Sequence, residues 1–469
     1  MTEVAFLSAA ELLTRFRSRQ LSPVEAAEAC LKQIDKYNPA VNAVCLVDAD
    51  RTLEQARASE RRWQSGDPAG PLDGVPTAIK DVFLTAGWPT LKGSKLSDPN
   101  LIEDVDAPAV AALREAGAVF IGKTTTPELG WKGVTDSPLS GPTRNPWDPS
   151  RTAGGSSGGS AAALMLGMGT LATGTDAGGS IRIPASFCGH PGIKPTLGRV
   201  PHWPPPPYGT LAQAGPMARD VADLALMMDV LVRPDPRDWT SLPPETVKYR
   251  ECVELGVKGL RIAFSPDLGR VRVDPEVAGL VAAAVEVFAD LGAQVEHETP
   301  GFADPDRTFE VLWNCSAVRA TRMYSDEQLE LLDPGLKCIA DEGRGCSIAD
   351  YMQAVQAQAE LGVTMGLFHQ RWDLLLTPTM PIPAFEAGRD VPVGWQDYRW
   401  QSWTPFTYPF NITQQPAASV PCGFTESGLP VGLQIVGARN ADALVLQAAA
   451  AYERARPSDR RPPMLKDHN

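Results

Sequence analysis

The sequence predicts a mixed α/β fold in which a central β-sheet is covered by helices. Of its 469 residues, 43% are hydrophobic and 21% are charged, an ordinary globular composition that supplies a large buried core. Short apolar segments typical of strands alternate with amphipathic segments typical of helices, and this alternation indicates α/β architecture. Turns rich in glycine separate several of these elements, so polar side chains are expected at the ends of strands.

The first 65 residues are predicted to form a helical layer. Ser22-Pro23-Val24-Glu25 is a capping box with proline at the first helical position, and apolar side chains follow it at helical spacing. After this layer, residues 74–79 have the sequence Gly-Val-Pro-Thr-Ala-Ile and predict a short buried strand. The strand ends in Lys80 and Asp81, and charges are rare in buried strands. For Asp81 we expect a structural ion pair.

Between residues 107 and 208 the predicted helices and strands continue to alternate. The expected elements are a helix at 107–116, a strand at 118–122, a helix at 160–166, a strand end at 171–176 and a crossover at 193–198. Gly117 stops the first of these helices. Residues 202–208 contain four consecutive prolines, which supply no backbone donors, so they predict a stiff surface loop.

The second half of the chain repeats the pattern of helix and strand. Long apolar or amphipathic stretches predict helices at 220–232, 275–291, 302–370 and 442–455. Shorter apolar runs predict extended segments at 260–264, 294–295, 373–379, 418–421 and 432–437. No fixed-period repeat or low-complexity tract occurs, so a repeat architecture is not expected.

The charge balance and the cysteines argue against several classes of protein. A formal net charge of −13 leaves no basic surplus for a nucleic-acid backbone. The eight cysteines are scattered and form no C-x-x-C pair, so buried reduced thiols are expected and no metal site. The chain starts with an acid and a short apolar stretch, unlike a secretory signal, and residues 152–175 predict a core segment and no membrane span. We therefore expect a cytoplasmic protein.

Two turns rich in glycine and serine carry the candidate chemistry. They are Gly154-Gly155-Ser156-Ser157-Gly158-Gly159-Ser160 and Thr175-Asp176-Ala177-Gly178-Gly179-Ser180-Ile181-Arg182. Each turn offers backbone N–H groups without side chains beside a hydroxyl group. Acyl transfer requires this pairing, because a nucleophile must lie near donors that hold the developing oxyanion.

The base that activates such a serine is predicted to be a lysine. An alcohol is a poor nucleophile at neutral pH, so a neighbouring group, most often histidine, must accept its proton. Histidine is scarce here, the five being His190, His202, His297, His369 and His468. A buried lysine can replace it, because desolvation lowers its pKa and leaves a neutral amine. Lys80 follows two apolar residues at the end of a strand and is placed for this role.

The segments around these residues resemble the amidase signature family. The matching motifs are Gly74-Val75-Pro76 before Lys80, Asn145-Pro146-Trp147 before the first turn, the run Gly-Thr-Asp-x-Gly-Gly-Ser-x-Arg ending at Arg182, Lys194-Pro195-Thr196-Leu197-Gly198-Arg199-Val200-Pro201 and Gly428-Leu429-Pro430-Val431-Gly432-Leu433-Gln434. The signature core spans about residues 70–200, and weaker similarity covers almost the whole chain. The resemblance implies one α/β/α sandwich domain over residues 1–469, with a variable substrate-loop region at about 300–410.

The resemblance also implies a Ser–Ser–Lys triad that hydrolyses the C–N bond of amides. Ser180 is the expected nucleophile, Ser156 the bridging serine on a cis peptide bond, and Lys80 the general base. Lys80 would take a proton from Ser180 through Ser156, Ser180 would attack the carbonyl, and water would hydrolyse the acyl-enzyme. No metal or organic cofactor is required.

Further residues of the two turns receive supporting roles. The backbone N–H groups expected to form the oxyanion hole are those of Ala177, Gly178, Gly179 and Ser180. The resemblance implies that Asp176 and Arg182 brace the nucleophile loop. Ser157 either hydrogen-bonds within the site or fills the turn.

Two other motifs in this region have weaker support. Gly154-Gly155-Ser156-Ser157-Gly158 satisfies the G-x-S-x-G pattern of the α/β-hydrolase elbow. An elbow needs a strand directly before its serine, and residues 145–152 predict a loop. Residues 167–172 satisfy a relaxed dinucleotide fingerprint but follow a predicted helix, whereas that fingerprint follows a strand.

The substrate depends on loops outside the signature core. These are residues 131–141, the proline segment 202–208 and an aromatic segment at 395–410, whose bulk favours a hydrophobic or aryl group in a small-molecule amide. The aromatic side chains serve either as core or as pocket wall; the candidates for the wall are Trp131, Trp203, Tyr208, Trp395, Trp400 and Trp403. Gln414 occupies a position where the family commonly has glycine.

Three other functions remain open from the sequence. A carbamate presents the same carbonyl to the same triad, so urethane hydrolysis is the main alternative. A glutamine amidotransferase subunit ranks lower, because no docking element rich in lysine and arginine occurs and the tyrosine-rich segment of that branch is absent at residues 350–370. A non-catalytic homologue ranks lowest because the triad is intact. A monomer and a homodimer are both compatible with the sequence.

Overall fold

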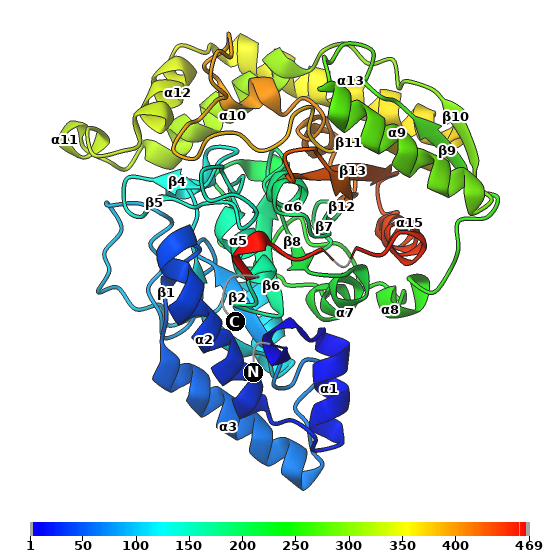
Figure 1. Cartoon of the computed structure of the whole chain (residues 1–469). Coiled ribbons are helices and arrows are strands. Elements are labelled where there is room, and N and C mark those ends of the chain that lie inside the picture. Colours follow the sequence, from blue (N-terminus) through cyan, green and yellow to red (C-terminus); the bar gives the residue numbers. More distant parts are fainter. Residues whose placement is uncertain (1–2, 459, 466–469) are drawn as a thin grey trace.

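A mixed sheet of 11 strands forms the centre of the computed structural model, which describes residues 3–458 and 460–465 (Figure 1). The strands are β1 (Val44–Leu46), β2 (Pro76–Lys80), β3 (Val119–Thr124), β6 (Leu171–Asp176), β7 (Gly192–Lys194), β8 (Gln213–Ala218), β9 (Arg261–Phe264), β10 (Gln294–His297), β11 (Leu374–Pro378), β12 (Ala417–Phe424) and β13 (Pro430–Gly437). Their order across the sheet is β1-β3-β2-β6-β8-β7-β12-β13-β11-β9-β10. A separate pair consists of β4 (Asp136–Ser137) and β5 (Gly141–Pro142).

Helices cover both faces of the sheet. They are α1 (Ala9–Arg17), α2 (Pro23–Val41), α3 (Ala49–Ser65), α4 (Pro108–Glu115), α5 (Gly158–Met165), α6 (Arg182–Cys188), α7 (Val221–Leu231), α8 (Tyr249–Cys252), α9 (Pro275–Asp290), α10 (Asp306–Thr321), α11 (Asp326–Leu329), α12 (Pro334–Arg344), α13 (Ile348–Arg371), α14 (Pro409–Ile412) and α15 (Asp442–Ala455). Helices α4, α7, α9 and α15 share one apolar core with the strands, whereas α2 and α5 share another. The central sheet covered by helices confirms the predicted fold class.

The alternation of side chains along β2 decides which face carries the chemistry. Ile79 belongs to the core beneath α4 and α7, and Ala78 belongs to the core beneath α5. Lys80 is two residues beyond Ala78, so it points to the α5 face. The side chain of Lys80 is therefore directed toward the glycine-rich turn that begins α5.

A further aromatic core lies between the sheet and the helices α10 and α12. Figure 1 shows α10, α12 and α13 together at one end of the molecule, with α1 and α3 at the opposite end. Trp313 of α10 is central in this core, with Tyr208 stacked on it at a ring-centroid distance of 3.8 Å. Phe309 of α10 and Trp400 of this core lie against Gly178, in the second glycine-rich turn.

Most predicted elements coincide with observed ones, and the exceptions have local causes. The capping box at Ser22 and Glu25 is present, and α15 has the predicted bounds 442–455. The N-terminal layer is not wholly helical, because β1 joins the sheet edge beside β3. The helical stretch predicted at 302–370 is divided into α10, α11, α12 and α13. The short α6 and the strand β8 were not predicted, and β8 contains Gly215 and Pro216, which weaken any strand signal.

Two predictions about the surface also differ from the structure. The proline segment 202–208 is mostly part-buried and contains a cis bond between Trp203 and Pro204. All eight cysteines are unpaired, but only Cys30 and Cys188 are buried, while Cys45 and Cys338 are exposed. No helix in the described part of the chain is long and apolar enough to cross a membrane.

Candidate active site

A cavity of about 390 Å³ lies where β2 and β6 end, and both Ser156 and Ser180 line it. The two strands run parallel and side by side, so their carboxyl ends meet at one edge of the core. Lys80 is the last residue of β2, and Asp176 is the last residue of β6. Each strand thus ends in a polar side chain, and ligand sites in α/β sheets commonly lie at the carboxyl ends of strands. The sequence-predicted triad is therefore gathered around one cavity.

Lys80 is completely buried and is surrounded by hydroxyl groups. Its Nζ lies within hydrogen-bonding distance of three hydroxyl oxygens, with the Oγ of Ser156 at 2.7 Å, the Oγ of Ser157 at 2.9 Å and the Oγ1 of Thr175 at 2.9 Å. None of these hydroxyl groups is charged, so no counter-charge in contact with the amine compensates it for lost hydration. Burial lowers the pKa of Lys80 well below its usual 10.5, although the negative charge of Asp176 opposes the shift. The neutral amine, a proton acceptor, is thus favoured.

The bridging position depends on a glycine beside Ser156. The Gly155–Ser156 peptide bond is cis, which agrees with the resemblance. A Cβ at Gly155 would lie 2.3 Å from the backbone carbonyl carbon of Val134, so only glycine fits at this close approach. The turn continues into α5, and the backbone N–H of Ser157 donates to the carbonyl of Ser180 at 3.1 Å. This bond ties the first glycine-rich turn to the second.

The carboxylate of Asp176 shapes the nucleophile loop. It accepts the backbone N–H of Gly179 at 2.7 Å and that of Ile181 at 3.2 Å. It also forms a fully buried ion pair with Arg182, with Nε and Oδ2 2.9 Å apart. Burial would raise the pKa of Asp176, but the charge and hydrogen bonds of Arg182 outweigh it and hold that pKa below its usual range. Asp176 is therefore ionised and closes the loop around Ser180.

The free backbone donors of this loop differ from the predicted set at one residue. The N–H of Gly179 is already taken by Asp176. The N–H groups of Ala177, Gly178 and Ser180 donate to no protein atom in the described chain. Three of the four predicted donors are thus available to a developing oxyanion, because a donor that is already engaged stabilises new charge less effectively.

A buried polar network holds Arg182 in place. Its guanidinium donates to the carbonyl of Thr407 at 2.9 Å, to Gln434 at 2.7 Å and to Asn411 at 2.6 Å. Asn411 in turn donates to the Asp176 carboxylate at 2.9 Å. These partners come from β13 and from the segment around α14, so distant parts of the chain brace the nucleophile loop.

Gln414, the departure from the family pattern, lies beyond this network. Its φ is +61°, in the left-handed region that glycine adopts without strain. This conformation accounts for glycine being common at the position. Gln414 does not line the cavity, so its side chain does not alter the cavity itself.

Of the six aromatic residues predicted for the pocket wall, only Tyr208 lines the cavity. Trp400 and Trp403 are buried in the aromatic core, where they pack on Phe309 and Phe187. The other three are Trp131, which packs at the start of α12, Trp395, which donates to Ser402 at 2.8 Å, and Trp203, which lies under Arg237. Trp400 still borders the site indirectly, since a Cβ at Gly178 would lie 2.7 Å from its ring.

Several lining residues had no role in the sequence prediction. The prolines at 204–207 form one wall, and His202 lies beside them. Burial lowers the pKa of His202 to about 4, so its ring is neutral at pH 7. Lys92, Arg319 and Arg322 also line the cavity. The run of prolines was the one local signal for this wall, whereas nothing in the sequence links Lys92 with two arginines more than 200 positions away.

The side chains present suit acyl transfer. A buried amine whose pKa is lowered contacts a serine hydroxyl, a second serine lines the same cavity, and unpaired backbone N–H groups lie beside that second serine. Among the residues that the structure describes, no three His, Cys, Asp or Glu side chains come together as metal ligands would.

Comparison with known proteins agrees with this geometry. A family model described as Amidase matches residues 25–446. An acylamidase of Rhodococcus erythropolis is 39% identical, with 98% of each chain covered. A glutamyl-tRNA(Gln) amidotransferase subunit of Myxococcus xanthus is 36% identical, over 96% of this chain and 97% of that protein. The crystal structure of a bacterial aryl acylamidase of the amidase signature family superimposes with a TM-score of 0.92 at 32% identity and covers 99% of both chains. The chain therefore belongs to the amidase family and is an amide-hydrolysing enzyme.

Proposed function

We propose that this enzyme cleaves hydrophobic or aryl amides through an acyl-enzyme on Ser180, with Ser156 as proton relay and Lys80 as base. The observation that carries the proposal is the surroundings of Lys80. It is fully buried, and its Nζ contacts three hydroxyl groups, of which those of Ser156 and Thr175 belong to residues that line the same cavity as Ser180. A lysine held for structure is normally paired with a carboxylate, so this arrangement supports a role as base.

The proposed reaction has two steps and uses Ser156 and Ser180, which line one cavity, together with Lys80, which contacts Ser156. Ser180 loses its proton to Ser156, whose own proton passes to Lys80, while the Ser180 oxygen bonds to the amide carbon. The oxyanion that forms accepts hydrogen bonds from the unpaired N–H groups of Ala177, Gly178 and Ser180. The C–N bond then breaks as Ser156 protonates the leaving nitrogen, and Lys80 returns a proton to Ser156. Water attacks the ester by the same relay and releases the acid and free Ser180.

The walls of the cavity support an apolar substrate group. The prolines at 204–207, Tyr208, Val82, Leu129 and Ala212 contribute carbon-rich surface around the two serines. A cavity of about 390 Å³ matches the size of pockets that hold small organic ligands. An aryl or alkyl amide is therefore the proposed substrate class, in line with the names of the acylamidase relatives.

A carbamate is the second candidate, because its carbonyl would meet the same serine and the same N–H donors. Glutamine, the natural choice for an amidotransferase subunit, has no apolar group to occupy the proline wall. A cytoplasmic location and a monomeric or dimeric state stay predictions. A panel of chromogenic anilides, aryl carbamates and glutamine separates the three substrate classes by kcat/KM.

The nucleophile is tested by Ser180→Ala, with Ser186→Ala as the matched control. Ser186 is an equally buried serine on α6 that does not line the cavity. Ser180→Ala is expected to abolish anilide turnover and labelling by a fluorophosphonate, while Ser186→Ala keeps both. The melting curve by circular dichroism checks that both variants fold.

Continued labelling of folded Ser180→Ala protein would overturn the assignment of Ser180. Activity that requires added partner subunits together with glutamine would overturn the stand-alone amidase. Either result leaves the family membership unchanged, since that rests on the whole chain.

A further inference from the structure

Every charged residue that lines the active-site cavity is basic. These residues are Lys92, Arg319 and Arg322, and no aspartate or glutamate belongs to the lining in the described part of the chain. The protein as a whole has the opposite balance, with 56 acidic and 43 basic residues. The cavity is therefore a positive site on a negative protein, and such a site attracts anionic ligands.

The two arginines have no protein partner that explains them. Neither Arg319 nor Arg322 lies within ion-pair distance of a carboxylate among the described residues. Other arginines of the same region are paired. Arg307 forms an ion pair of 3.1 Å with Glu310, which also lies on α10. Arg399, in a neighbouring loop, forms an ion pair of 3.1 Å with the same glutamate. The two guanidinium groups at the cavity are thus free to bind a ligand.

The placement of these cations follows from α10 and from the loop after β2. Arg319 lies in the last turn of α10, and Arg322 follows three positions later, so the two share one side of the helix end. Lys92 belongs to a different segment, whose backbone N–H donates to Asp81 at 3.1 Å. Cations from two distant parts of the chain therefore meet at one cavity.

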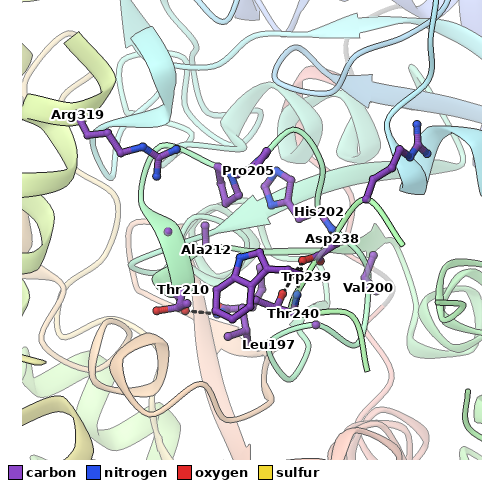
Figure 2. Close-up of a pocket in the computed structure, with 15 residues that line it drawn as sticks. Leu197, Val200, His202, Pro205, Thr210, Ala212, Asp238, Trp239, Thr240 and Arg319 are labelled. Atoms are coloured by element: carbon purple, nitrogen blue, oxygen red, sulfur yellow. Dashed lines mark hydrogen bonds between the residues drawn. The ribbon is translucent and has the colours of Figure 1, made fainter. Parts of the chain in front are cut away.

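Arg319 also lines a second pocket, on the other side of the proline wall. This second pocket, drawn in Figure 2, shares His202, Pro205, Pro206 and Ala212 with the active-site cavity. Figure 2 shows the guanidinium of Arg319 directed toward Pro205. Arg319 thus lies where the two pockets adjoin, next to the proline wall that they share.

A structural explanation accounts for only part of this pattern. Basic residues near the carboxyl end of a helix are stabilised by the helix dipole, which suits Arg319 and Arg322. The dipole of α10 does not explain Lys92, and it does not explain the lack of any acidic residue in the lining. A ligand charge explains all of these observations together.

We propose that the preferred amide carries a carboxylate remote from its scissile bond, and that Arg319 and Arg322 bind it, with Lys92 adding to the positive field. Guanidinium groups recognise carboxylates by paired hydrogen bonds, and an apolar spacer between amide and carboxylate would lie along the proline wall. This inference rests on the proposed function, because it assigns a substrate class to the same site. The carboxylate belongs either to the acyl part or to the amine part.

The test uses matched pairs of neutral and anionic substrates. For the acyl part, butyric acid 4-nitroanilide is compared with glutaric acid mono-4-nitroanilide; for the amine part, N-butyrylaniline is compared with N-butyryl-4-aminobenzoate. The wild-type enzyme is expected to prefer the anionic member of one pair by about fivefold in kcat/KM, the size of one solvent-exposed ion pair. Raising the salt concentration should reduce this preference.

The double variant Arg319→Ala/Arg322→Ala is the decisive protein. It should lose the preference through a higher KM for the anionic substrate, while kcat/KM for the neutral partner changes less than about twofold. The control is Arg307→Ala, an exposed arginine on the same helix outside the cavity lining, which should keep the preference.

Equal rates on both members of both pairs, or a preference that survives in the double variant, would overturn the inference. Those outcomes still include turnover of neutral anilides, so they leave the proposed function standing. If no anilide is hydrolysed and Ser180 is not labelled, it is the proposed function that fails.

Discussion

Two completely buried lysines on neighbouring strands have opposite surroundings. Lys80 at the end of β2 contacts three hydroxyl groups, whereas Lys123 in β3 lies 2.9 Å from the carboxylate of Asp81. Lys123 also donates to the carbonyl of Phe83 at 3.0 Å. Lys123 is in register with Ile79, so the two lysines point to opposite faces of the sheet.

The difference shows that burial alone does not make a lysine a base. Both amines lose their hydration, but Lys123 regains stabilisation from an adjacent negative charge and Lys80 does not. In an apolar interior an unpaired amine is stabilised by losing its proton. The neighbouring groups thus distinguish Lys80 from Lys123, and substitutions at both test the role proposed for Lys80.

Lys80→Met is expected to have the largest effect. Loss of the base should lower kcat by about a thousandfold, within the range found for positioned general bases. Its stability should hold or rise, because methionine fills the space without an uncompensated amine. Kinetics on a 4-nitroanilide and thermal unfolding measure the two quantities, and a loss of less than tenfold in kcat would remove Lys80 from the mechanism.

Lys123→Met should have the opposite effects, with a large loss of stability and a small loss of kcat. The variant leaves the carboxylate of Asp81 buried without its counter-charge, so the free energy of unfolding should fall by about 3 kcal/mol. The double variant Asp81→Asn/Lys123→Met should recover most of this loss, because neither charge remains. Urea unfolding gives the energies, and kcat of the folded protein should fall far less than in Lys80→Met. Equal losses of kcat in the two lysine variants would erase the distinction between them.

The pH dependence of activity should come from Lys80. Because burial lowers the pKa of its amine, kcat/KM should rise about tenfold per pH unit below that pKa and then level off. Lys123→Met should keep this acidic limb. Lys80→Arg should lack it in whatever activity is left, since a guanidinium does not lose its proton in this range. A pH profile of Lys80→Arg with an unchanged limb would assign the titration to another group.

The free energy of unfolding should also rise with pH because of the lowered pKa of Lys80. Between the lowered pKa of folded Lys80 and its usual value of 10.5, the unfolded chain binds more protons than the folded protein. Stability contributed by this residue therefore rises with pH across that window. Lys80→Met should flatten that part of the curve, which urea unfolding at several pH values detects.

The grouping of Lys80, Ser156 and Ser180 at one site was predictable because its signals are local. Lys80 ends an apolar strand, and Ser156 and Ser180 sit in short turns whose glycines are visible in the sequence. The carboxylate of Asp176 lies only three residues before the Gly179 N–H that it binds. Even so, residue types could not show that this N–H is engaged by Asp176 and so is lost to the predicted oxyanion hole, because that depends on the direction of one side chain.

The pocket wall was not predictable because its partners are distant in sequence. Trp400 and Trp403 occur in a segment with no regular period, and only the fold shows that they pack behind the loop. Strand β1 has three residues, and β8 contains a glycine and a proline, so neither has a clear pattern. Arg319 and Lys92 line the same cavity, and this proximity likewise appears only in the three-dimensional structure.

Tyr208 extends the comparison to a buried polar group with no partner, and its substitution should have the smallest effect. Its ring stacks on Trp313, but its hydroxyl makes no hydrogen bond to the described protein, and burial keeps the pKa of that hydroxyl well above 10. Tyr208→Phe removes an unpaired polar atom and keeps the stacking, so the free energy of unfolding should rise by up to about 1 kcal/mol. Turnover of a neutral anilide should change less than about twofold.

Tyr208→Ala, which deletes the ring from the cavity wall, should instead raise KM. A tenfold loss of kcat in Tyr208→Phe would mean that the hydroxyl binds the substrate during turnover, and Tyr208 would then join Lys80 in the proposed mechanism.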